Sequence, residues 1–97
     1  SAVLFLFEKG SIGDKYNIVG EKELDNLEMA QMISGYMGMP LDYEMVDFHG
    51  SRPGHDLRYA LDGSLMKEIG WKPNINLDKR INQVVKWSLN NDRWLKI

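Results

Sequence analysis

Residues 25–40, DNLEMAQMISGYMGMP, carry the start, the body and the end of one helix. Asp25 followed three residues later by Glu28 is a capping box with aspartate at the cap. Apolar residues then recur at helical spacing. Gly38 and Pro40 supply the stop. The stretch therefore predicts a helix that begins just after Asp25 and ends before Gly38.

On either side of this helix the pattern predicts short elements of both kinds. The apolar run 2–9 ends at Gly10 and is either a buried strand or the end of a helix. Three segments have the alternation and the flanking turn residues of strands, namely 16–19, 43–48 and 57–61. Asp62 and Asn76 can each cap a further helix. We therefore expect an α+β fold for the isolated chain, with a small sheet of short strands and three to four helices.

Length and composition limit the classes of protein. Ninety-seven residues support one domain, 1–97. Folding could bury about 65% of the surface of the unfolded chain, and we expect the three tryptophans to form much of the core. The absence of cysteine excludes disulfides and thiolate metal sites, and two histidines are too few for a zinc site. No apolar run could span a bilayer, and no basic stretch precedes the run at 2–9. We expect a cytoplasmic chain without membrane or metal.

Charge is distributed unevenly along the chain. Residues 1–50 hold three basic and nine acidic side chains, a net charge of −6, and residues 67–97 hold seven basic and three acidic ones, a net charge of +4. The acidic half argues against a nucleic-acid surface, which needs a concentrated positive field. The alternative is that the two halves attract each other in the folded chain.

The segment 51–59, SRPGHDLRY, holds the candidate binding residues. Pro53 favours an extended Arg52, and Pro53-Gly54 indicates a type II turn. Arginine offers a planar fork for phosphate oxygens and histidine can donate to a hydroxyl, so Arg52 and His55 could clamp a diphosphate or a ribose. The other interpretation is a loop whose arginine pairs with a nearby carboxylate, Asp47 or Asp56.

Asn26 is a second candidate, since it falls in the first turn of the helix, where free N–H groups and the helix dipole favour an anion. The other interpretation is that it serves only the backbone. Neither 11–13 nor 19–20 has the spacing of a dinucleotide or phosphate loop, and no tyrosine is followed four residues later by lysine. The chain thus offers binding residues but no catalytic set.

At these residues the sequence resembles a family. The stretches GDKYNIVGEKELDNLEMA, RPGHDLRYALD and EIGWKPNINLDKRINQVVKWSLNNDRW are similar to the C-terminal part of nucleotide-sugar 4,6-dehydratases. Within that family they resemble the dTDP-glucose 4,6-dehydratase branch of the extended short-chain dehydrogenases. The family usually has an acidic residue at the position of Ser51 and a second glycine at that of Val19.

The resemblance implies a lyase that binds NAD in an N-terminal Rossmann domain and makes a 4-keto-6-deoxy sugar. It implies that cofactor and catalytic residues lie upstream, and that this chain binds the nucleotide sugar without catalysing its reaction. The residues implied in binding are Asn26, Ser51, Arg52, Pro53, Gly54 and His55.

Two alternatives stay open beside this implication. One is a free-standing module that binds nucleotides or nucleotide sugars without catalysis, or a part of a related epimerase. The other is an assembly role through an apolar patch at 2–7, where the chain begins hydrophobic and without a cap, as if an element were cut.

Overall fold

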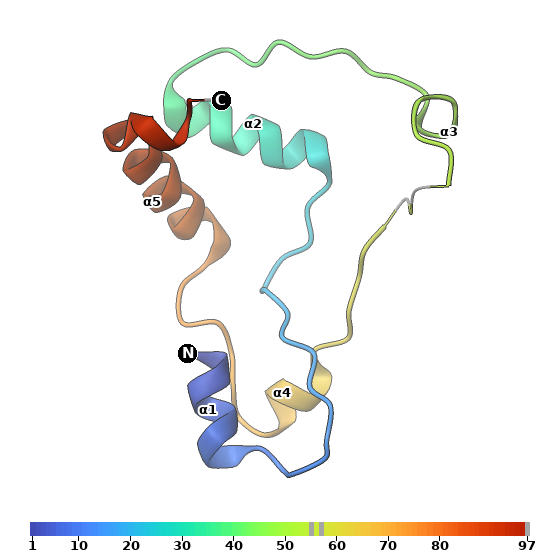
Figure 1. The fold of residues 1–97 in the computed structure, drawn as a ribbon, viewed down its shortest axis with the longest axis vertical. Helices are drawn as coiled ribbons and strands as arrows, with labels where there is room; N and C mark the ends of the chain where they lie inside the picture. The colour runs from blue at the N-terminus through green and yellow to red at the C-terminus, as the bar shows by residue number, and fades with distance from the viewer. Residues whose placement is uncertain (55, 57, 97) are drawn as a thin grey trace.

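The computed structural model describes residues 1–54, 56 and 58–96. Within these residues it contains five α-helices and one 3-10 helix (Figure 1). In chain order they are α1 (Ala2–Lys9), α2 (Asn26–Met37), α3 (Phe48–Ser51), α4 (Ser64–Glu68), α5 (Leu77–Asn90) and η1 (Asp92–Trp94).

The predicted α+β fold is wrong, because no β-strand occurs in the described part of the chain. Residues 16–19 and 43–47 have no regular structure, Phe48 opens α3, and the described residues of 57–61 also lack it. A strand exists only when a neighbour completes its ladder of backbone hydrogen bonds. No backbone hydrogen bond joins these segments to one another in the parts described. Their alternating sequence therefore leaves them as connecting segments.

Helix starts and stops, in contrast, follow the local sequence. Asp25 accepts a hydrogen bond from Glu28 N at 2.7 Å, and Glu28 Oε2 accepts one from Asp25 N at 2.9 Å, so the predicted capping box is confirmed. Gly38 ends α2 with a left-handed φ of 68°. Asn76 Oδ1 accepts from Lys79 N at 2.8 Å and begins α5 as predicted. Of the two alternatives for 2–9, the helix is the observed one.

Helices α2 and α5 pack against each other in the upper left of Figure 1. Val85 of α5 is buried, with 7% of its surface exposed. An apolar hollow of about 220 Å³ lies beside it and is lined from α2 by Ile33 and Met37. Tyr36 of α2 donates a hydrogen bond of 2.5 Å to Asp78 of α5, which fixes the register of the two helices.

A second, smaller cluster surrounds Met66 of α4, the most deeply buried side chain described at 1% exposure. Ala2 of α1 is also buried. The start of α1 is attached to the segment before α5, since Trp71 Nε1 donates to Ser1 Oγ and Ser1 Oγ donates to Asn74 Oδ1, each at 3.4 Å.

The molecule as a whole is open. Its exposed area is 8561 Å², against roughly 5,700 Å² for a compact chain of this mass. Its radius of gyration is 17.3 Å, against about 12.5 Å for a compact domain. Trp87 and Trp94 are 54% and 64% exposed, so a core built on the three tryptophans is wrong. No described helix has the length and apolar character needed to cross a membrane.

Candidate functional site

The candidate loop lies on a long excursion of the chain between α2 and α4 (Figure 1). The excursion, residues 39–63, is called the arm below, and α3 lies near its middle. Asp47 organises α3, because its Oδ2 accepts a hydrogen bond from Gly50 N at 2.8 Å and its carbonyl accepts one from Ser51 N at 2.9 Å. The loop that follows therefore starts from a defined helical turn.

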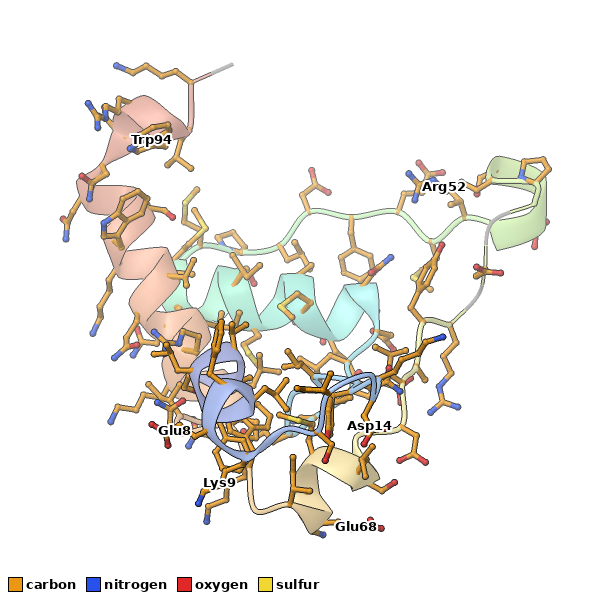
Figure 2. All side chains as sticks on the ribbon, turned by 60° about the horizontal axis from the view of Figure 1, so that its bottom comes forward. Glu8, Lys9, Asp14, Arg52, Glu68 and Trp94 are labelled. Carbon is orange, nitrogen blue, oxygen red and sulfur yellow. The ribbon has the colours of Figure 1, made fainter. Side chains whose placement is uncertain are left out.

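Arg52 comes directly after this helical turn and is exposed. Pro53 and Gly54 form the turn that the sequence predicts, with a φ of 78° at Gly54, close to the value that glycine supplies at the third position of a type II turn. His55 lies outside the described residues. Figure 2 shows Arg52 beside α3 on the arm, far from Trp94 at the other end of the molecule.

In the described part of the chain Arg52 does not pair with a local acid. Neither of the described ion pairs involves it, and Asp47, one of the two suggested partners, is engaged by the backbone of α3. Asp56, the other suggested partner, forms no ion pair with Arg52. Among the described residues the guanidinium of Arg52 has no acidic partner, so its N–H donors face solvent.

Asn26 occupies the first position of α2, as the sequence predicts. In the capping box the side chains of Asp25 and Glu28 each accept a hydrogen bond from the backbone N–H of the other residue, so Asp25 caps the helix. Asn26 is exposed, and its amide makes no described hydrogen bond. The interpretation that Asn26 serves the helix backbone is therefore not what the structure shows.

The structure does not bring Asn26 and Arg52 into contact. No described hydrogen bond or ion pair joins the two residues, and neither lines the surface cavity of about 480 Å³ that the described residues form elsewhere. That cavity lies between the segment 19–21 and the segment 63–73 and includes Trp71. In the described part of the chain no group of acidic or histidine side chains could hold a metal ion.

One ion pair near the candidate residues was not predicted from the sequence. Arg58 donates from Nε to Glu23 Oε1 at 2.5 Å and from Nη2 to Glu23 Oε2 at 2.6 Å. This fork holds the pKa of Glu23 below its ordinary value and raises that of Arg58. The partners are 35 residues apart, so no local pattern could have revealed them.

Two further hydrogen bonds connect distant segments around this region. Asn17 Nδ2 donates to the carbonyl of Asp62 at 3.1 Å, and Leu77 N at the start of α5 donates to Glu21 Oε1 at 2.7 Å. The segment that leads into α2 is thus attached by side chains to the returning limb of the arm and to α5. Neither described ion pair joins residues 1–50 to residues 67–97, so ion pairing there does not connect the acidic and basic halves.

Comparison with known proteins finds relatives along nearly the whole chain. It is 35% identical to the dTDP-glucose 4,6-dehydratase of Xanthomonas campestris pv. campestris (ATCC 33913), over 98% of this chain and 29% of that protein. It is 33% identical to the dTDP-glucose 4,6-dehydratase of Salmonella typhimurium, over 97% of this chain and 28% of that protein. It is 37% identical to the dTDP-glucose 4,6-dehydratase of Haemophilus influenzae, over 93% of this chain and 30% of that protein. The chain spans less than a third of the length of these relatives. No protein-family model matches it, and no solved structure does either.

Proposed function

Since this chain is homologous over nearly its whole length to part of the dTDP-glucose 4,6-dehydratases, we propose that it supplies the nucleotide-sugar-binding portion of such an enzyme. The ligand class is a nucleoside diphosphate sugar resembling dTDP-glucose. The chain's own part in the reaction is to hold the nucleotide end of that ligand.

The observation that carries the proposal is the exposed guanidinium of Arg52. It stands between the short helix α3 and the Pro53–Gly54 turn, and within the described part of the chain no acid pairs with it. A planar guanidinium can donate two parallel hydrogen bonds to a phosphate. A pyrophosphate carries the charge that such a donor requires, whereas the hydroxyls of the sugar do not.

The remaining residues have supporting roles in the proposal. Ser51, Pro53, Gly54 and His55 line the nucleotide end, with His55 on the ribose. Asn26 contacts the nucleoside diphosphate from the start of α2, where unpaired backbone N–H groups add a positive field.

The redox step of such an enzyme needs NAD, which takes up and returns a hydride. The residues present do not fit this cofactor. Its pyrophosphate requires a glycine-rich turn between a strand and a helix. The glycines at 10, 13 and 20 lack that spacing, and no described strand precedes them. The chain's contribution is therefore binding, and the lyase reaction belongs to the complete enzyme.

Binding can be tested on the chain itself by titrating isotope-labelled protein with thymidine diphosphate in an NMR experiment. We expect amide shifts confined to residue 26 and residues 51–58, with a dissociation constant of roughly millimolar order, because an open site leaves most of the ligand in water. Arg52→Ala should weaken binding by roughly tenfold or more, the scale of a charge-assisted hydrogen bond.

Arg80→Ala is the matched control. Arg80 is also exposed, and its guanidinium hydrogen-bonds only to Gln83 on its own helix among the described partners, at 3.3 Å. Its removal should leave the dissociation constant unchanged. Equal weakening by both variants, or no shifts at millimolar ligand, would contradict the proposed function.

A second candidate function is supported by α1. Val3, Leu4 and Phe7 are 61%, 72% and 84% exposed. Proteins rarely leave such an apolar patch in contact with water unless it binds a partner. We propose that it docks onto the remainder of a dehydratase polypeptide, the more than two thirds of the relatives' length that this chain does not match. Phe7→Asp should abolish association with that polypeptide in light scattering, and association that survives Phe7→Asp would refute the docking.

A further inference from the structure

We propose that Glu23 and Arg58 form a positioning clamp that sets the arm, and with it Arg52, at a fixed place relative to the start of α2. The proposal rests on the proposed function, since it concerns how the two binding elements are held. Neither residue touches the ligand in this proposal. Both act through Arg52 and Asn26.

The position of the two partners supports this role. Glu23 lies three residues before Asn26, on the segment that enters α2, and Arg58 lies six residues after Arg52, on the returning limb of the arm (Figure 1). The pair therefore connects the two elements that bear the candidate binding residues. One further described hydrogen bond, from Asn17 to Asp62, joins the same two stretches, but it lies nine residues before Asn26 and ten residues after Arg52.

The arm needs such a connection because it has few contacts of its own. Its exposed apolar side chains include Met45 at 74%, Val46 at 61%, Tyr59 at 78% and Leu61 at 63%. Its backbone is not paired in a sheet within the parts described. A segment with so little buried surface samples many conformations unless side chains restrain it.

The geometry of the contact restrains the position of the arm and adds little to the stability of the fold. Two parallel hydrogen bonds from one planar guanidinium to one carboxylate fix both the distance and the angle between the partners. The pair is exposed, with 69% of the Arg58 side chain and 51% of the Glu23 side chain accessible. Exposed ion pairs add little to folding. Removing this one should thus release the arm without unfolding α2 and α5.

The first test measures the arm directly and needs no ligand. The chain contains no cysteine, so Gln31→Cys in α2 and Met45→Cys in the arm create two unique sites for spin labels. We expect a narrow distance distribution for the labelled chain. Glu23→Gln and Arg58→Met should each broaden it, and the exchanged pair Glu23→Arg with Arg58→Glu should narrow it again.

Lys96→Met is the control, because Lys96 forms the other described ion pair, with Asp92 at 3.7 Å, which is also exposed and lies far from the arm in sequence. It should leave the distribution unchanged. A distribution that is already broad with Glu23 and Arg58 intact, or that Glu23→Gln does not broaden, would overturn the clamp.

The second test measures binding of thymidine diphosphate by NMR. Glu23→Gln and Arg58→Met should raise the dissociation constant roughly two- to fivefold, the scale of an exposed ion pair. The exchanged pair should recover most of that loss, which a change of charge near the phosphate alone would not do.

The two tests separate the two proposals. Absence of binding by the unmodified chain would contradict the proposed function, while the distance measurement still decides the clamp. Binding that is unaffected by Glu23→Gln, together with a broadened distance, would show that the arm's placement does not matter to the ligand and would overturn the inference.

Discussion

At the scale of single residues, the hydrogen bond between Tyr36 and Asp78 has a pH dependence with a definite sign. The Asp78 carboxylate accepts a hydrogen bond from the Tyr36 hydroxyl and raises the pKa of Tyr36 above its ordinary value of 10.0. A group whose folded pKa is raised stabilises the folded chain below its unfolded pKa. That stabilisation is lost as the pH rises through the raised value. The loss of the Tyr36 proton should therefore weaken the contact between α2 and α5 in strongly alkaline solution.

Asp78→Asn should lower the pKa of Tyr36 toward 10.0, because it removes the negative charge that opposes formation of a phenolate. The measurement is the NMR titration of the Tyr36 ring carbon that bears the hydroxyl. Asp92→Asn, which removes a carboxylate beyond the end of α5, should not change that titration. An unchanged midpoint in Asp78→Asn would show that the two side chains do not meet in solution.

At the scale of elements, the packing of α5 on α2 depends on which valine faces inward. Val85 is 7% exposed and its neighbour Val84 is 50% exposed. Val85→Ala should lower the free energy of unfolding by about 1–2 kcal/mol, through lost burial and the space left behind. Val84→Ala should change it by less than about 0.5 kcal/mol. Urea unfolding followed by circular dichroism measures both, and equal losses would mean that α5 is rotated from the face described.

The same elements show what a sequence can and cannot predict. Asp25, Gly38 and Asn76 were identifiable because a cap is a contact between residues no more than a few positions apart. The segments 16–19 and 43–48 were misassigned as strands, since a strand depends on a distant partner that alternation alone cannot supply.

The candidate site also combines features that the local sequence predicts with contacts that only the folded structure shows. The turn at Pro53–Gly54 follows from the conformational limits of those two residues. Whether Arg52 pairs with Asp47 is a question of tertiary structure, and so is the pairing of Glu23 with Arg58. The tryptophans were assigned to a core from hydrophobicity alone, yet Trp94 stays 64% exposed, since an open chain has little interior to offer.

At the scale of the whole molecule, the open shape should be visible in unfolding. The urea m value scales with the surface that unfolding exposes. The unfolded chain has roughly 16,200 Å² of surface and a compact fold of this mass roughly 5,700 Å². With 8561 Å² still exposed when folded, unfolding uncovers roughly three quarters of the area that a compact domain would uncover. The m value should be reduced in the same proportion.

Small-angle X-ray scattering provides an independent measurement of the same property. It should give a radius of gyration near the 17.3 Å of the Cα atoms and well above the value of about 12.5 Å for a compact domain. Addition of the rest of a dehydratase polypeptide should protect the exposed face of α1 from hydrogen exchange if that face is a docking surface. A compact radius together with a full-sized m value would contradict the open arrangement, because the arm would then have to fold back onto α2 and α5 and bury the side chains that this structure leaves in water.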